Sequence, residues 1–156
     1  MKKNYKKGFT LIELLVVIAI IGILSSIVLA SLSSARSKGE DAAIQTTVSN
    51  MRVQAELLYS NIGNYGPDVT LGNCSAATGN SIFGTSTTGS LKNLTADLIT
   101  KAGAAANTSC VVTGNAWAVA AKFKGNGAFC ADSTGTAKAS TTAASDEATI
   151  TGAACN

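Results

Sequence analysis

The sequence contains no histidine and no C-x-x-C pair, and it has a single proline, Pro67. Without histidine, a Ser-His-Asp triad and a Cys-His nucleophile pair lack an essential side chain, and the usual zinc-ligand patterns are missing. Aromatic residues make up only 5% of the chain. Ala, Gly, Ser and Thr dominate beyond the N-terminus, so the core should be small and only moderately stable without cross-links.

Basic residues are scarce outside the first seven positions. The formal charge of +3 includes four N-terminal lysines, and from Gly8 onward the chain has eight basic and nine acidic residues. A basic patch with interleaved aromatic residues, which nucleic-acid binding favours, is not found in the sequence. The N-terminal lysines instead indicate membrane topology, with the N-terminus in the cytoplasm.

The four cysteines all lie in the C-terminal two-thirds of the chain, at Cys74, Cys110, Cys130 and Cys155. An even number of cysteines beyond an N-terminal apolar segment predicts two disulfides in an oxidising, extracytoplasmic compartment. The alternative, four free structural thiols, would require a cytosolic protein, and the N-terminus argues against that.

The N-terminal apolar run, Phe9 to Leu32, is long enough to cross a hydrocarbon core of about 30 Å. Glu13 interrupts it, at a cost of roughly 2.5–3.5 kcal/mol for a lone charge at mid-bilayer. A cleaved signal peptide, with a cleavage site at residues 33–35, is one interpretation, and an uncleaved anchor is another. Neither explains Glu13.

The stretch "KKGFTLIELLVVIAIIGIL" resembles the signature of type IV prepilins and the related pseudopilins. The resemblance implies that prepilin peptidase cuts between Gly8 and Phe9 and methylates the new amine of Phe9. It also implies that Glu13, with Thr10 of the same motif, acts in subunit assembly by neutralising the Phe9 amine of a neighbouring subunit. The simpler alternative is a Glu13 side chain that only snorkels to the headgroups.

One nearly continuous helix is predicted from Thr10 to Ile62, with Gly63 as its stop and Pro67 shortly after. The alternative is two helices that break near residues 37–39. An amphipathic face follows the apolar run at alternating spacings of four and three residues: Ile44, Val48, Met51, Ala55, Leu58 and Ile62. Many pilins have a proline about 20 residues into the mature chain. None is present here, so local melting near Gly22 is not indicated.

The remainder of the chain predicts an α+β fold. Residues 68–89 are rich in turns, and a short helix is expected between an N-cap at Ser90 and a stop at Gly103. Gly114-Asn115 indicates a hairpin, after which Trp117 and alternate residues face a core. We therefore expect the long helix to pack on an antiparallel sheet of three or four strands, with the tail from Ser133 onward held mainly by Cys155.

These elements divide the chain into five segments. They are a leader, a hydrophobic helix half, an amphipathic helix half, a connecting region with a short helix, and a sheet with a disulfide-closed C-terminal region: 1–8, 9–35, 36–62, 63–108 and 109–156.

Four cysteines allow three disulfide connectivities. If Cys110 and Cys130 flank one strand, they lie roughly 9.5 Å apart across the sheet, beyond the ~7 Å limit between Cα atoms. That excludes their bond and leaves two pairings open. The resemblance favours Cys130–Cys155, because pilins bound their C-terminal loop in this way. We therefore choose Cys74–Cys110 and Cys130–Cys155.

No catalytic or cofactor-binding set emerges, and we expect a protein that is not an enzyme. The alternative is a calcium site formed by Asp132, Asp146 and Glu147, as in the C-terminal loops of some pseudopilins, but their spacing is not that of an EF-hand. Solvated loop carboxylates are the preferred interpretation, and no cofactor or metal is expected.

The resemblance implies a structural subunit of a type IV pilus, a helical homopolymer. Its partners would be prepilin peptidase and the assembly machinery of the inner membrane, where the precursor would reside before it joins a surface filament. The alternatives are a pseudopilin of a type II secretion or DNA-uptake system and a single-pass anchored surface receptor or adhesin. The cysteine-closed C-terminal region favours a pilin.

Overall fold

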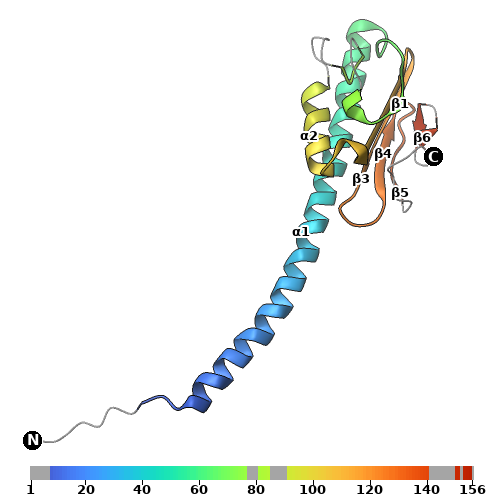
Figure 1. Ribbon diagram of the computed structural model, residues 1–156. Coiled ribbons are helices and arrows are strands. Elements are labelled where there is room, and N and C mark those ends of the chain that lie inside the picture. Colours follow the sequence, from blue (N-terminus) through green and yellow to red (C-terminus); the bar gives the residue numbers. More distant parts are fainter. Residues whose placement is uncertain (1–7, 77–80, 85–90, 141–149, 152, 156) are drawn as a thin grey trace, which may run out of the picture. The chain divides into compact units, whose positions relative to one another are not determined.

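The computed structural model describes residues 8–76, 81–84, 91–140, 150–151 and 153–155. The chain forms two compact units, Met1–Arg36 and Ser37–Asn156, which are described separately below. The fold is α+β, as predicted from the sequence, with a long N-terminal helix and an antiparallel sheet (Figure 1).

The long helix α1 spans Leu11–Ile62 without the break considered near residues 37–39. It ends where Gly63 adopts a φ of +79°, a backbone conformation that favours glycine. The Gly63 N–H donates to the Tyr59 carbonyl at 2.7 Å. The predicted stop at Gly63 is therefore confirmed.

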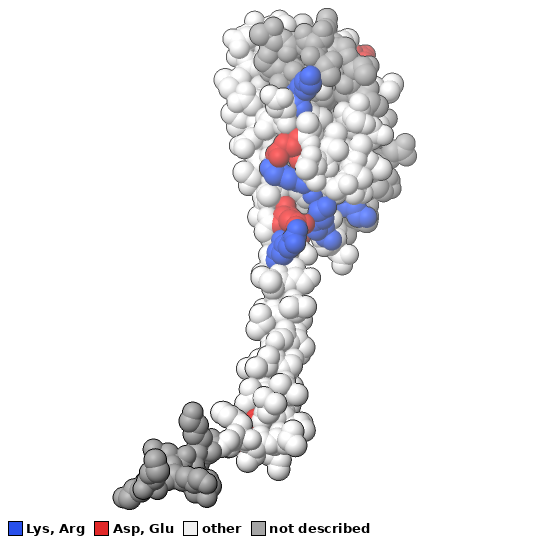
Figure 2. Space-filling view, turned by 60° about the vertical axis from the view of Figure 1, so that its left-hand side comes forward, with Lys and Arg blue, Asp and Glu red and all other residues white. Residues whose placement is uncertain are grey.

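In the first unit, α1 is apolar and its large side chains are exposed. Those from Leu11 to Leu32 are between about half and four-fifths exposed, and Phe9, just before the helix, is 88% exposed. The helix is long and apolar enough to cross a membrane, judged by its length and composition. Figure 2 shows this stretch as almost uniformly uncharged.

In the second unit, the remainder of α1 packs on the sheet through the predicted stripe. Ile44, Val48, Met51 and Ala55 are fully buried in the same apolar cluster as Trp117. The predicted stripe includes one residue too many. Ile62, the last residue of the helix, is 49% exposed and does not belong to the buried face.

Helix α2, Lys92–Ala102, packs on α1 partly through polar contacts. Buried Thr47 of α1, which lies outside the predicted stripe, donates from Oγ1 to the Asp97 carboxylate at 3.1 Å. The Lys101 ammonium bonds both side chains and holds the pKa of Asp97 below its ordinary range. The N-cap is Leu91, without a side-chain cap bond, and the expected cap Ser90 lies outside the described residues. Gly103, with a φ of +89°, ends the helix as predicted.

The sheet has five antiparallel strands in the order β1-β2-β3-β4-β5, which is one more than the upper expectation. Their bounds are β1 Val69–Gly72, β2 Thr108–Thr113, β3 Ala116–Lys122, β4 Ala128–Asp132 and β5 Ala137–Ser140. Strand β1 lies in the region interpreted as turn-rich, and β5 lies in the tail. Both are edge strands, paired through backbone bonds to β2 and β4. The hairpin predicted at Gly114-Asn115 joins β2 and β3.

Both faces of the sheet are apolar. Trp117, Val119 and Ala121 face the helices and are fully buried, as predicted. The outer face, defined here as Val111, Ala118, Ala120 and Cys130, is buried as well. It is covered by a C-terminal hairpin of β6, Ile150–Thr151, and β7, Ala154–Cys155, which lies against β3 and β4. Two single-turn 3-10 helices, Cys74–Ala76 and Ala105–Asn107, complete the described elements.

A polar contact fixes the aromatic part of the core. The Trp117 indole N–H donates to the Glu56 carboxylate at 3.4 Å, and the Tyr65 hydroxyl donates to it at 3.0 Å. Burial and the hydrogen bond to Glu56 raise the pKa of Tyr65 to about 12, so the phenol stays protonated at neutral pH. Trp117, the single tryptophan, is fully buried in the second unit, so its fluorescence can report the unfolding of that unit.

Candidate processing and assembly site

The residues expected at the cleavage site lie immediately before α1. Gly8, Phe9 and Thr10 are outside any helix, and the Phe9 side chain is 88% exposed. A Cβ atom built on Gly8 meets no heavy atom within 4 Å, so the chain itself places no steric demand on this residue.

Thr10 and Glu13 form a capping box at the start of α1. The Thr10 N–H and hydroxyl both donate to Oε2 of Glu13 at 2.8 Å, and the Glu13 N–H donates to Oγ1 of Thr10 at 3.3 Å. Such a box satisfies N–H groups that a helix end leaves without partners. The T-x-x-E spacing, visible in the sequence, is the signal from which this box could have been predicted.

The capping box leaves part of the Glu13 carboxylate available. Both hydrogen bonds go to Oε2, and within the described part of the chain Oε1 accepts none. Residues 8–35 contain no lysine or arginine, and Glu13 is their only ionisable side chain. A cation that pairs with Glu13 must therefore come from a chain terminus, from outside this segment or from another molecule.

Comparison with known proteins places a motif on this segment. The sequence profile of the prokaryotic N-terminal methylation motif matches residues 3–29, which include the capping box and the residues before it. The chain carries the N-terminal methylation motif of type IV prepilins. The resemblance noted from the sequence is thereby confirmed.

A known protein is also similar in sequence to this chain. The type IV wide pilus major component PilA4 of Thermus thermophilus is 45% identical over 53 residues, which are 34% of this chain and 40% of that protein. The chain thus matches about two fifths of the length of this relative. No solved structure matches the chain with significance.

Beyond the prepilin motif, the structure places the four cysteines in two disulfides. Cys74, in the first 3-10 helix, is bonded to Cys110 of β2, with a Cα–Cα distance of 4.9 Å. Cys130 of β4 is bonded to Cys155 of β7, at 5.9 Å. Strand β3 separates Cys110 from Cys130, and their side chains belong to clusters on opposite faces of the sheet. Each bond is expected to stabilise the second unit by about 3 kcal/mol.

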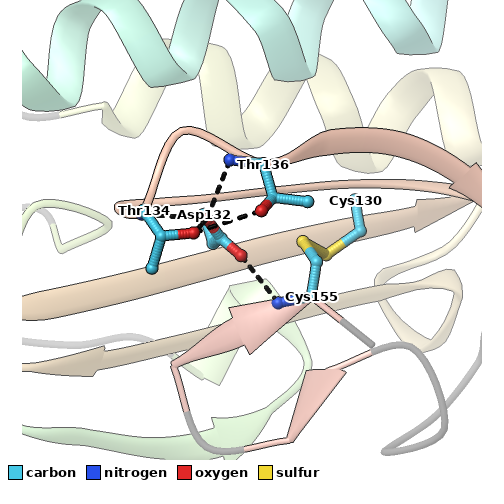
Figure 3. The surroundings of a disulfide bond; sticks show 5 residues. All are labelled: Cys130, Asp132, Thr134, Thr136 and Cys155. Atoms are coloured by element: carbon cyan, nitrogen blue, oxygen red, sulfur yellow. Dashed lines mark hydrogen bonds between the residues drawn. A yellow bond between two sulfur atoms is a disulfide. The ribbon is translucent and has the colours of Figure 1, made fainter.

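Asp132 is not the solvated loop carboxylate expected from the sequence. It is the last residue of β4 and is only 1% exposed. Oδ1 accepts from the Thr134 N–H at 2.9 Å, the Thr134 hydroxyl at 2.6 Å and the Thr136 N–H at 3.1 Å, while Oδ2 accepts from the Cys155 N–H at 2.8 Å (Figure 3). Four donors satisfy the carboxylate from within the chain.

The calcium alternative groups Asp132 with Asp146 and Glu147. Those two residues lie outside the described part of the chain. Among the described residues, three or more His, Cys, Asp or Glu side chains do not gather closely enough to hold a metal ion.

The stability that Asp132 contributes should be lost in acid. Burial opposes its ionisation, but the hydrogen bonds from Cys155, Thr134 and Thr136 hold its pKa below the ordinary value. The contribution is therefore fully present above the unfolded pKa of about 3.9 and is lost as the pH falls through the folded pKa.

This expectation is tested by urea unfolding of the detergent-solubilised chain, followed by Trp117 fluorescence. At about pH 7, wild type should be more stable than Asp132→Asn by about 1–3 kcal/mol, because buried donors lose their acceptor. The difference should shrink as the pH falls below about 3.9 and the carboxylate takes up a proton. A difference that stays constant over this range would contradict an ionised, hydrogen-bonded Asp132.

Proposed function

We propose that this protein is a structural subunit of a type IV pilus, processed after Gly8, methylated on Phe9 and polymerised through its N-terminal helix. The observation that carries the proposal is the placement of Glu13. It is the one charged side chain of residues 8–35, which include the exposed apolar part of α1, and it lies in the N-terminal methylation motif four residues after Phe9.

Cleavage before Phe9 would turn a peptide nitrogen into an ammonium group near Glu13. In an apolar environment each charge alone is costly, whereas a close and hydrogen-bonded pair offsets much of that cost. Glu13 would thus be unfavourable in the free subunit and favourable when it faces the Phe9 ammonium of a neighbour. The capping box supports this role, because it orients the carboxylate through Oε2.

The exposed apolar helix supports self-assembly. Residues 9–35 would form the membrane anchor of the precursor and then the filament core, and residues 36–62 would join that core to the head. The connecting region 63–108 and the sheet with its disulfide-closed C-terminal region, 109–156, would form the head. No part of this role is catalytic.

The lysines of the leader, residues 1–8, support a single-pass precursor in the inner membrane with its N-terminus in the cytoplasm. The proposed partners there are prepilin peptidase and the pilus assembly machinery. The assembled form would be an extracellular helical homopolymer of this chain.

Mass spectrometry of the N-terminus of the chain recovered from sheared surface filaments tests the proposal. We expect a chain that begins at N-methylated Phe9. An anchored receptor or adhesin would keep Met1 and would be absent from the filament fraction, which would overturn the proposal. A mature N-terminus without surface filaments would instead favour a pseudopilin of a secretion or DNA-uptake system.

A further inference from the structure

The C-terminal hairpin covers the second apolar face of the sheet. The outer-face residues are 5% exposed or less, and the partly buried Ala153 and Cys155 pack on them. The two strands of this hairpin, β6 and β7, have only two residues each. Backbone pairing within so short a hairpin is a weak source of stability. Something else must hold it in place.

Two contacts hold Cys155 on the sheet, and both come from the same face of β4. Cys130 and Asp132 are two residues apart on that strand, so their side chains project from one side. Cys130 bonds the sulfur of Cys155, and Asp132 accepts a hydrogen bond from its backbone N–H at 2.8 Å (Figure 3). The carboxylate is almost completely buried, where a charge-assisted hydrogen bond is strong.

We propose that Asp132 is a positioning residue for the Cys130–Cys155 disulfide. It docks the C-terminal hairpin on the outer face before the sulfurs join, and it keeps the hairpin docked when the bond is reduced. The turn at residues 133–136 orients the carboxylate, because three donors from Thr134 and Thr136 hold Oδ1 and leave Oδ2 directed at Cys155. The disulfide then locks a contact that Asp132 has already made.

The covalent step is ordinary thiol–disulfide exchange. With oxidised glutathione as the oxidant, one cysteine thiolate attacks it, forms a mixed disulfide and releases one glutathione thiolate. The second cysteine thiolate then attacks the protein sulfur and releases the other glutathione. Two electrons pass from Cys130 and Cys155 to glutathione, and the two thiol protons go to solvent. Asp132 takes no part in these bonds and acts only through the distance between the thiols.

The test measures the equilibrium of each disulfide with reduced and oxidised glutathione in the full chain in detergent micelles. Thiols are trapped by alkylation, and non-reducing peptide mapping reports which cysteines are paired. Asp132→Asn is the informative variant, because an amide has one acceptor oxygen. It cannot accept hydrogen bonds both from the turn, Thr134 and Thr136, and from the Cys155 N–H. Asp97→Asn is the matched control, since it removes a carboxylate whose partners are Lys101 and Thr47.

We expect Asp132→Asn to lower the equilibrium constant for the Cys130–Cys155 bond at least about tenfold, as befits a lost charge-assisted hydrogen bond. The Cys74–Cys110 constant should stay within about twofold of wild type, as for distant sites. Asp97→Asn should leave the Cys130–Cys155 constant within the same range. An unchanged Cys130–Cys155 constant in Asp132→Asn would overturn the proposal. Equal losses at both bonds would also overturn it, because Asp132 would then act only on general stability.

A second measurement keeps the proposal falsifiable if Asp132→Asn does not fold. In a Cys130→Ala chain the disulfide cannot form, but the Asp132 carboxylate and its donors remain. The amide hydrogen of Cys155 should still exchange slowly with deuterium. Exchange at the rate of an unstructured peptide would show that the disulfide alone docks the hairpin.

Discussion

A Gly8→Val chain should accumulate as the full-length precursor in the membrane, with no mature chain and no surface filaments. The resemblance to prepilins implies that the peptidase requires a small residue before the cut. Valine should not disturb the chain itself, because the position of its Cβ is open and residues 8–10 are outside the helix. Without cleavage Phe9 has no free amine, so Glu13 of the neighbouring subunit lacks its counter-charge. Immunoblotting of membrane and sheared fractions measures both effects.

Gly22→Val provides the matched control for this experiment. Gly22 also has open space at its Cβ position, and it lies in the apolar part of α1, away from the expected cleavage site. The control therefore adds the same side chain to the N-terminal segment without changing the residue before the cut. This variant should be cleaved like wild type. A mature-size band from Gly8→Val would refute the assignment of Gly8–Phe9 as the cleavage site.

A Glu13→Gln chain should be inserted and cleaved but should assemble poorly. Glutamine serves a capping box as glutamate does, so the bonds with Thr10 remain possible and only the charge is lost. The Phe9 ammonium is then left without its counter-charge in an apolar filament core. Removing one partner of a buried pair costs about 3–5 kcal/mol, so filament yield should fall by about a hundredfold or more. The measurement is the ratio of sheared filament to membrane-bound mature chain.

Thr10→Val separates the charge from the cap. It removes the hydroxyl that makes two of the three bonds of the box and keeps the Glu13 carboxylate. Losing the cap hydroxyl should cost about 1 kcal/mol, which predicts a much smaller loss of filaments than Glu13→Gln. Equal losses in the two variants would assign the role to capping. Wild-type yield in Glu13→Gln would leave only a Glu13 that snorkels to the headgroups.

The sequence by itself determined the elements whose signals are local. The position of Glu13 in the apolar run and the residues before it identified the prepilin motif. The period of about 3.6 residues from Ile44 to Leu58 predicted the buried face of α1, and Gly63 predicted its end. Each of these signals depends on a few neighbouring residues and on backbone preferences that act within one turn.

The structure alone decided what depends on residues far apart in the chain. Strands β1 and β5 are short edge strands that are held by backbone hydrogen bonds to β2 and β4. Backbone bonds do not depend on side-chain identity, so the sequence of these strands shows little alternation of apolar and polar residues. The burial of Asp132 depends on a donor at Cys155, 23 residues later, and the outer face of the sheet depends on the hairpin that carries that cysteine. The residues next to Asp132 in the sequence predict a solvated carboxylate. Only the folded chain brings the hydrogen-bond donors to it and removes water from it.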